Sequence, residues 1–292
     1  QGTFTAAAHR LGVSKASMSQ RIAELERAVG SALVHRTTRS VRLAEAGQRL
    51  VDETRGPFAQ IAQSFVDAKE ASGEARGLVR LTMPVALGRQ KIVPLLHGFL
   101  ETHPSIRLEI EMSDRLVSLS TEAFDLAIRH ASQAPDTHVA WLLCNTQSVL
   151  VASQRYIKSH GEPQTPEELT RHRCLHYPRG QGESAWSFEP RVARKGARVS
   201  VPVAGPMAAN NSEALRQAAE AGLGIALIPD FTAQVGLETG TIQRVLTQWR
   251  PVGTFAEKLY AMRPYSPHTP IAVSLLVRHL RDQLRDGFGT KA

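Results

Sequence analysis

The sequence predicts an N-terminal all-α helix-turn-helix head, a long linker helix and an α/β region of two lobes. Two short helical patterns are broken at residues 11–13, and an apolar stripe with three- and four-residue spacing follows over residues 45–72. From residue 78 onward, strand patterns alternate with helical ones, which is typical of α/β folds. The chain has 292 residues, of which 42% are hydrophobic, enough for two or three domains with separate cores.

The first pattern covers residues 4–26 and predicts two short helices joined by a turn at Leu11-Gly12-Val13. Ser14 is a favourable N-cap for the second helix, and apolar residues recur from Met18 at steps of four and three. The opposite face carries Lys15, Ser17, Ser19, Gln20 and Arg21. Such side chains suit a helix that enters the major groove of DNA. The alternative interpretation is an ordinary helical hairpin with a solvated polar face.

Positive charge is concentrated in the same part of the chain. Residues 1–50 hold eight Lys or Arg against three acids, so +5 of the formal net charge of +8 lies there. Such clustering is typical of a protein that binds a polyanion, and it favours nucleic acid as a partner. We find neither a run of about 18 apolar residues nor a basic leader before an apolar stretch, so we expect a cytoplasmic protein without membrane partners.

Residues 7–47 follow the order AAxxLGVSxxxxSxxIxxLExxxGxxLxxRTTRxVxLxEAG, which resembles the DNA-binding domain of LysR-type transcriptional regulators. The resemblance implies a winged helix-turn-helix over residues 1–44, in which the recognition helix reads bases and the wing holds phosphate. By position, the implied DNA-binding residues are Ser14, Lys15, Ala16, Ser19 and Gln20 on the helix and Arg36, Thr37, Thr38 and Arg39 in the wing. Relatives often have Gln-Pro at positions 15 and 16 and Arg at position 20, so the operator sequence cannot be transferred. Relatives also carry an earlier first helix, which we expect to be missing here.

Residues 45–72 predict one long amphipathic helix. Its apolar stripe consists of Ala46, Leu50, Thr54, Phe58, Ile61, Phe65 and Ala68. A stripe this narrow suits a partner helix rather than a globular core. The resemblance implies antiparallel pairing with a second subunit, which sets two heads apart on a two-fold operator. Gly56-Pro57 predicts a kink within the helix, and residues 73–77 read as a hinge.

The remainder predicts two lobes between which the chain crosses twice, leaving a cleft. Lobe I is expected over residues 78–150 and 255–292, and lobe II over residues 151–254. In lobe I we expect a parallel sheet with strands at 78–83, 106–112 and 124–129 and helices at 92–100 and 116–122. In lobe II, Thr165-Pro166-Glu167-Glu168 predicts a capping box, strands are expected at 186–188, 199–203 and 225–229, and a helix at 212–221.

This region resembles the effector-binding domain of the same family, which is similar in fold to type 2 periplasmic solute-binding proteins. The matching phrases are VRLTMPVALGRQKIVPLL, RLEIEMSDRLVSL, FDLAIR and NNSEALRQAAEAGLGIALIPD. The implied effector-binding residues are Thr82, Pro84, Val85, Ala86, Arg129, His130, Asn210, Asn211, Ser212 and Pro229. Simpler interpretations are a plain strand residue for Thr82, an outer salt bridge for Arg129 and a capped helix start for Asn210-Asn211-Ser212.

Strand ends and helix N-termini in such a cleft favour small anions, often carboxylates. The loop at residues 84–88 has few hydroxyl groups, which makes an apolar or aromatic ligand more plausible. An organic acid or an aromatic metabolite is therefore expected as the effector.

The sequence shows no nucleophile elbow, P-loop, dinucleotide fingerprint or zincin helix, so we expect neither an enzyme nor a cofactor. His172-x-Cys174-x-His176 could ligate a metal, but a strand edge is the favoured interpretation. Cys144 and Cys174 are the only thiols and are expected to be buried.

Together, these features imply a DNA-binding regulator that is switched by a small effector. The expected partners are double-stranded operator DNA, the effector, RNA polymerase and further copies of the chain in a dimer or tetramer. A regulator of the same family that responds to redox or to no ligand is one alternative. A solute-binding module without DNA binding is the other.

Overall fold

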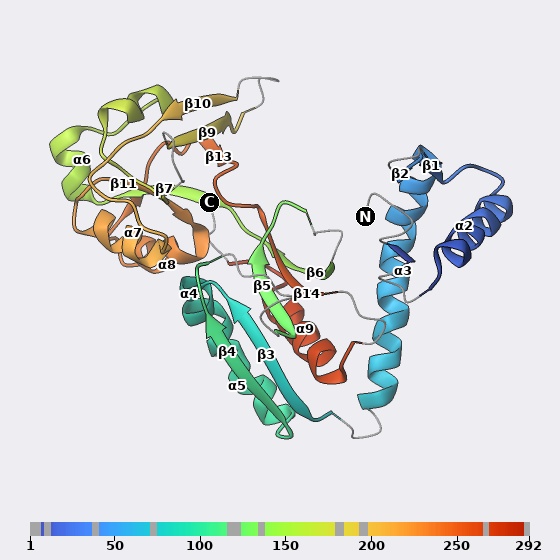
Figure 1. Cartoon of the computed structure of the whole chain (residues 1–292). Helices are drawn as coiled ribbons and strands as arrows, with labels where there is room; N and C mark the ends of the chain where they lie inside the picture. The colour runs from blue at the N-terminus through green and yellow to red at the C-terminus, as the bar shows by residue number, and fades with distance from the viewer. Residues whose placement is uncertain are drawn as a thin grey trace.

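The computed structural model describes residues 7–8, 13–36, 41–70, 75–115, 124–133, 138–178, 184–192, 198–264 and 269–288. Figure 1 shows three regions: a small head, a long helix that runs away from it, and two α/β lobes beside that helix. Within the described residues, no helix combines the length and the apolar character needed to cross a membrane.

The head is built on helix α2 (Lys15–Val29) and a two-stranded wing. Ser14 caps the helix as predicted, since its Oγ accepts a hydrogen bond of 3.1 Å from the Ser17 backbone N–H. The helix ends at Gly30, whose left-handed φ of 72° suits glycine. Strands β1 (Val34–Arg36) and β2 (Val41–Leu43) pair antiparallel. Only residues 7–8 of the predicted first helix are described, and both are helical.

Helix α3 (Glu45–Glu70) is continuous through Pro57. On its predicted stripe, Ala46 and Leu50 are half-buried, whereas Phe58 and Ile61 are 67% and 54% exposed. The side chains of Phe65 and Ala68 lie outside the described residues. Phe58 and Ile61 are the two most exposed large apolar side chains after Val192 among the described residues, and they support the expectation that a partner helix covers this stripe.

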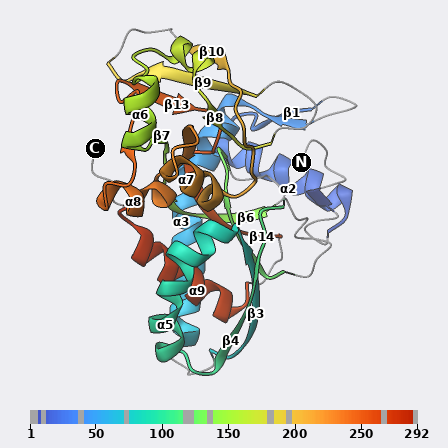
Figure 2. The same ribbon diagram turned by 90° about the vertical axis from the view of Figure 1, so that its left-hand side faces the viewer.

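Lobe I contains a sheet with the strand order β4-β3-β5-β14-β6. Its elements are β3 (Gly77–Met83), α4 (Val85–Leu87), the π-helical turn η1 (Gly88–Ile92), α5 (Val93–Thr102), β4 (Ile106–Met112), β5 (Leu126–His130), β6 (His138–Asn145), β14 (Lys258–Pro264) and α9 (Ile271–Leu284). Helices α5 and α9 lie side by side on this sheet (Figure 2), and His279 Nε2 lies 2.8 Å from the Leu95 carbonyl oxygen.

Two expectations for lobe I need correction. Strand β3 is parallel to β4 and β5, but β14 runs antiparallel to β5 and β6, so the sheet is mixed. Strand β14 returns from the other lobe without a crossover helix, and such a connection allows either direction. The helix expected from Ile92 already begins at Val85, directly after Pro84. The helix expected at 116–122 lies outside the described residues.

Lobe II contains two sheets, with strand orders β12-β7-β11-β8 and β10-β9-β13. Its elements are β7 (Ser148–Ala152), α6 (Gln154–His160), η2 (Pro166–Arg171), β8 (Cys174–Leu175), β9 (Ala185–Pro190), β10 (Val199–Pro202), α7 (Ser212–Glu220), β11 (Ile225–Pro229), α8 (Asp230–Glu238), β12 (Gln243–Arg244) and β13 (Trp249–Val252). One core lies between the two sheets and includes Tyr156, Trp186 and Phe188; the other lies under α7 and α8.

The start of lobe II differs from expectation in two places. Strand β7 pairs with β11 and β12, so the chain changes sheet between residues 145 and 148 rather than at residue 150. The predicted capping box is wrong: η2 is a 3-10 helix, and the Thr165 side chain makes no cap hydrogen bond. Glu168 instead accepts a hydrogen bond of 2.8 Å from the Gln164 backbone N–H.

Candidate nucleic-acid interface and ligand site

The first turns of α2 present a polar face to solvent. Ser14, Lys15, Ala16 and Gln20 are exposed, and Ser19 is half-buried. Gln20 Nε2 donates a hydrogen bond of 2.9 Å to Glu24 Oε1, which holds the amide along the helix surface. The buried Met18 anchors the opposite face. The predicted base-reading residues therefore share one accessible face of a fixed helix.

The wing is tied to the same helix by a residue that the sequence analysis did not single out. Glu26 Oε1 accepts hydrogen bonds from the backbone N–H groups of Leu33 at 2.9 Å and Val34 at 3.1 Å. A carboxylate that accepts two N–H donors is a strong positioning contact. Glu26 therefore fixes the position of the start of β1 relative to α2. The predicted wing residues Thr37, Thr38 and Arg39 lie outside the described residues, as does the side chain of Arg36.

The start of α3 packs against the segment that leads into β1. The Ala44 backbone N–H donates to the Leu33 carbonyl oxygen at 2.9 Å. A Cβ added to Gly47 would lie 2.1 Å from that same oxygen. Only glycine fits this approach of helix to strand, so Gly47 joins the head to the linker helix.

In the other half of the chain, Asp114 joins the two lobes. Its Oδ1 accepts a hydrogen bond of 3.0 Å from the Val85 backbone N–H at the start of α4. Its Oδ2 accepts one of 3.0 Å from Asn211 Nδ2 of lobe II. Asn211 also caps α7, because its Oδ1 accepts from the Glu213 and Ala214 backbone N–H groups. Two of the predicted effector residues, Val85 and Asn211, therefore meet at one carboxylate.

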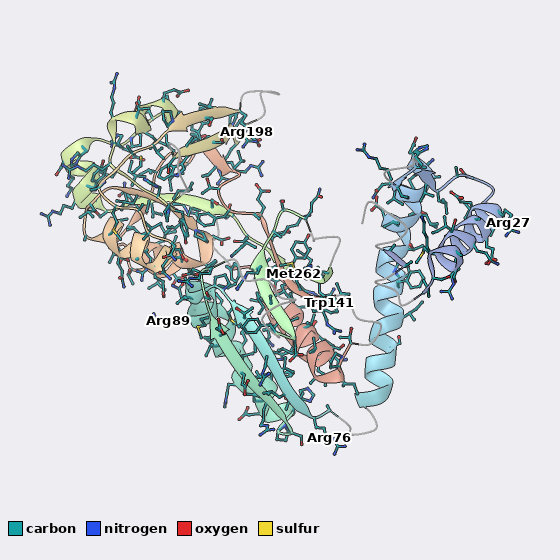
Figure 3. The ribbon with its side chains drawn as sticks, in the orientation of Figure 1. Arg27, Arg76, Arg89, Trp141, Arg198 and Met262 are labelled. Carbon is teal, nitrogen blue, oxygen red and sulfur yellow. The ribbon has the colours of Figure 1, made fainter. Side chains whose placement is uncertain are left out.

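Three further side chains of lobe I reach lobe II beside this bridge. Gln90 Nε2 donates to Glu213 Oε1 at 2.8 Å, and Arg89 Nη1 lies 3.4 Å from Glu213 Oε2. Lys91 Nζ donates to Gln234 Oε1 on α8. Figure 3 shows Arg89 at the end of lobe I that meets lobe II. The two lobes are thus held together by a row of polar contacts, which we call the lobe junction.

The other predicted effector residues lie around this junction in different environments. Thr82 is fully buried, and its Oγ1 accepts a hydrogen bond of 3.0 Å from Arg129 Nη2, so these two are brought together. Ser212 is buried and its hydroxyl lies 2.8 Å from Thr232 Oγ1. Pro84 and Pro229 precede α4 and α8, and Asn210 is exposed. Ala86 belongs to the core of lobe I, so its side chain faces away from the junction.

His130 ends β5 beside the junction, and its half-buried side chain is a neutral ring near pH 7. Its imidazole stacks on Phe231 with 5.9 Å between ring centroids and 8° between planes. Burial lowers the pKa of His130 to about 4, and Arg129 adds to the shift, while the Ala256 backbone opposes it. Both ring nitrogens are shielded from solvent. The folded chain therefore takes up a proton at His130 less readily than the unfolded chain.

We expect the stability of this domain to fall as the pH drops from about 6.5 to about 4. Between these values the unfolded histidine is protonated and the folded one is not, so up to about 3 kcal/mol is lost. His130→Phe keeps the stacked ring and removes the titration, so its urea unfolding free energy should change less over this range. His97→Gln, at a side chain that is 80% exposed, is the control and should behave like the wild type. Equal pH slopes for wild type and His130→Phe would contradict the assignment.

The two cysteines lie in different lobes and are buried. Cys144 is on β6 in the lobe I core, and Cys174 is on β8 in the core between the lobe II sheets. Burial raises the pKa of each thiol to about 12, which disfavours the reactive thiolate. The flanking histidines are engaged elsewhere: His172 Nδ1 lies 3.2 Å from Tyr156 Oη, and His176 Nδ1 lies 3.1 Å from Ser184 Oγ.

A polar recognition helix with a wing, a long helix and two joined α/β lobes define a ligand-responsive DNA-binding regulator. Residues 1–48 match the bacterial regulatory helix-turn-helix family of LysR type, and residues 72–285 match the LysR substrate binding domain. The chain belongs to the LysR-type transcriptional regulators. Members of this family bind DNA and small-molecule effectors and form oligomers.

Relatives match over nearly the whole chain. A probable HTH-type transcriptional regulator, LtrA, from Klebsiella pneumoniae is 29% identical over 97% of this chain and 90% of its own. An HTH-type transcriptional regulator from Xanthomonas campestris pv. campestris is 33% identical over 96% and 82%. The full-length structure of the Vibrio cholerae virulence activator AphB is similar with a TM-score of 0.60 and 27% identity, covering 96% of this chain and 93% of that one.

Proposed function

We propose that the lobe junction is the effector site and that it takes a small organic acid or an aromatic metabolite. The observation that carries this proposal is the Asp114 carboxylate, which accepts from one donor of each lobe, Val85 N–H and Asn211 Nδ2. A ligand carboxylate has the same acceptor geometry and can replace Asp114 at both donors. In support, the predicted residues Thr82 and Arg129 lie near the ends of β3 and β5, and Ser212 begins α7, which Asn211 caps.

Replacement of Asp114 by a ligand changes the contacts that hold the lobes together. A ligand can shift an equilibrium between two arrangements only by its difference in affinity for them. A ligand that spans Val85 and Asn211 binds more tightly to a conformation in which the distance between the two lobes is changed than to the present conformation. The altered spacing then changes how the subunits hold their two heads on DNA.

We further propose that the chain acts as a dimer or tetramer on operator DNA in the cytoplasmic nucleoid, with RNA polymerase as a partner at the promoter. The exposed Phe58 and Ile61 of α3 support a helix-to-helix contact between subunits. The redox-responsive alternative has less support, because both thiols are buried in separate cores.

Two classes of head variant test the DNA interface in gel-shift titrations. Arg39→Ala is expected to weaken binding to all duplexes and to lower the salt slope by about one per head, because a phosphate contact is lost. Gln20→Ala is expected to change which operator is preferred, by about 1–3 kcal/mol at one base pair. The control is Arg76→Ala, at an exposed arginine directly before β3 and away from the head (Figure 3).

Unchanged binding in both head variants would show that these faces do not contact DNA.

The lobe junction is tested separately. Asn211→Ala is compared with wild type in the same gel-shift titration with and without organic acids. A wild-type response to an acid that persists in Asn211→Ala would contradict the proposed effector site and leave the DNA interface untouched.

A further inference from the structure

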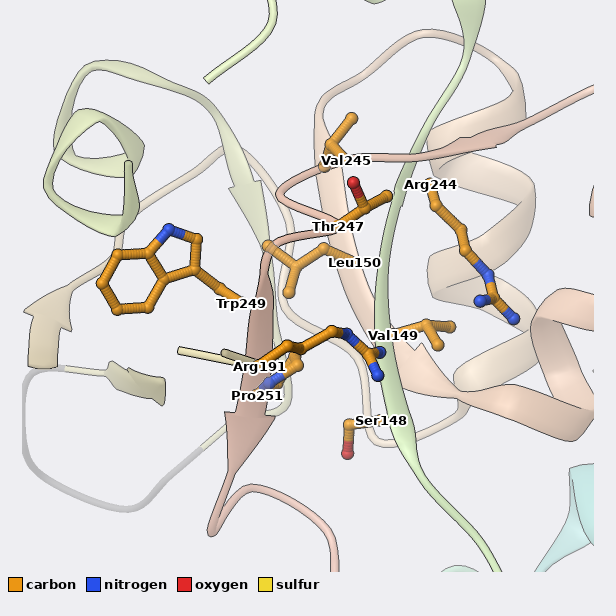
Figure 4. A pocket seen from close by; sticks show the side chains of 9 residues that line it. All are labelled: Ser148, Val149, Leu150, Arg191, Arg244, Val245, Thr247, Trp249 and Pro251. Carbon is orange, nitrogen blue, oxygen red and sulfur yellow. The ribbon is translucent and has the colours of Figure 1, made fainter. Parts of the chain in front are cut away.

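Lobe II contains a second pocket with two arginines, separate from the lobe junction. It has a volume of about 220 Å³ and lies between β7, β12 and β13. Its wall includes Arg191, Arg244, Ser148, Thr247 and Trp249. Figure 4 shows the Arg191 guanidinium beside Val149 and the Arg244 side chain approaching from β12, with both guanidinium groups pointing the same way in this view. The volume lies below the ~300 Å³ at which drug-sized sites begin, so a small metabolite fits.

The positive charge in this pocket is not neutralised by nearby acids in the described part of the chain. Glu189 and Glu257, on and near the adjoining strands, are both engaged by Arg250, at 2.6 Å and 3.0 Å. Neither the guanidinium of Arg191 nor that of Arg244 has an ion pair or hydrogen bond to any described residue. Two arginines without a carboxylate partner are suited to bind an anion.

The backbones of both arginines are held by neighbouring strands, while the Arg191 side chain is exposed and that of Arg244 is half-buried. The Arg191 backbone N–H donates to the Gln248 carbonyl oxygen at 2.9 Å, and Arg244 pairs with Val151 across β12 and β7. Between Val245 and Thr247, which both line the pocket, Leu246 has a φ of 53°. A left-handed leucine is strained, and such strain is found more often at ligand sites than elsewhere.

We propose that this pocket binds a small organic acid. Its carboxylate lies between Arg191 and Arg244, the buried Ser148 hydroxyl adds a donor, and its carbon frame packs on Val149 and Pro251. The site is distinct from the lobe junction and does not depend on the role proposed for it. A regulator with two separate acid sites in one domain can combine two metabolic signals.

Titration calorimetry of the full chain with benzoate, succinate, inorganic phosphate and neutral benzamide tests the proposal. Benzoate or succinate should bind saturably, and benzamide at least about tenfold more weakly, because it lacks the charge that the arginines require. In an Asn211→Ala background, which removes the lobe II contact of the junction, the double variant Arg191→Gln/Arg244→Gln should weaken the remaining acid binding at least about tenfold. The control Arg155→Gln, at an exposed arginine of α6, should bind like the wild type.

A second readout places the acid at this pocket. Benzoate should change the tryptophan fluorescence of the wild type, and the change should be absent in Trp249→Phe. Asn211→Ala disables only the junction, so one benzoate site should remain in this variant. Binding that is lost in Asn211→Ala but kept in the double arginine variant would overturn the pocket and leave the junction standing. Binding of phosphate alone, or of none of the anions, would also overturn it.

Discussion

Gly47→Ala is expected to weaken operator binding at least about a hundredfold while the two lobes stay folded. A Cβ at this position would lie 2.1 Å from the Leu33 carbonyl oxygen and 3.0 Å from its carbon. Both atoms belong to the backbone and cannot turn aside as a flexible side chain does. The clash can be relieved only if the backbone at Leu33, directly before β1, moves away from α3. This movement also breaks the Ala44–Leu33 hydrogen bond of 2.9 Å. Overpacking of this kind costs about 1–3 kcal/mol or more.

The effect on DNA binding exceeds the effect on stability, because the wing and the recognition helix must meet the duplex together. Glu26 links α2 to Leu33 and Val34, so a displaced Leu33 moves the wing relative to the helix. We expect fluorescence anisotropy with operator DNA to show at least a hundredfold loss, about 2.7 kcal/mol.

Gly98→Ala is the matched control for this substitution. Gly98 lies within α5, and a Cβ there meets no atom within 4 Å. Alanine should therefore leave DNA binding unchanged and stabilise the helix by about 0.5–1 kcal/mol. Wild-type DNA affinity in Gly47→Ala would contradict the prediction, because it would show that the head binds DNA even when its contact with α3 is changed.

The parts of this fold that depend on neighbouring residues in the chain could be predicted from the sequence. The Ser14 cap, the buried Met18 and the Asn211 cap each depend on contacts within three or four residues. The period of apolar residues also predicted β4 and β11, because a half-buried or buried strand has its own pattern.

Features that depend on distant segments were not predicted. The antiparallel direction of β14 follows from which strands it joins after crossing from lobe II, and no local pattern records that choice. The Glu26 contact with the wing reaches seven and eight residues ahead through a turn. Arg191 and Arg244 are 53 residues apart, and they line one pocket only through the fold of lobe II.

Asp114 is an intermediate case. It follows β4, and the ends of the three parallel strands β4, β3 and β5 lie at the same edge of the mixed sheet. Thr82 and Arg129 were assigned to that edge, and the same reasoning applied to β4 would have included Asp114. Its bond to Asn211, however, depends on how lobe II closes against lobe I, which the sequence does not specify.

Gly205→Ala and Gly224→Ala are each expected to destabilise lobe II strongly. The short strand β8 lies between these two glycines: a Cβ at Gly205 would lie 2.1 Å from the Cys174 carbonyl oxygen, and one at Gly224 would lie 2.1 Å from that of Arg173. The same backbone segments form close hydrogen bonds, from the Cys174 N–H to the Ala204 carbonyl oxygen and from the Ile225 N–H to the Arg173 carbonyl oxygen, both 2.8 Å. The backbone cannot move far enough to accommodate a methyl group without lengthening these two hydrogen bonds.

The buried thiol of Cys174 reports this destabilisation. In a Cys144→Ser background it is the only thiol of the chain, and burial with a pKa raised to about 12 keeps it unreactive while lobe II is closed. Either alanine variant should lower the thermal midpoint by about 5 °C or more and speed labelling by a thiol reagent, because β8 opens more often. Gly98→Ala in the same background should label at the parent rate. Unchanged labelling rates in both variants would show that the backbone around β8 can accommodate the added methyl groups, and would contradict the prediction.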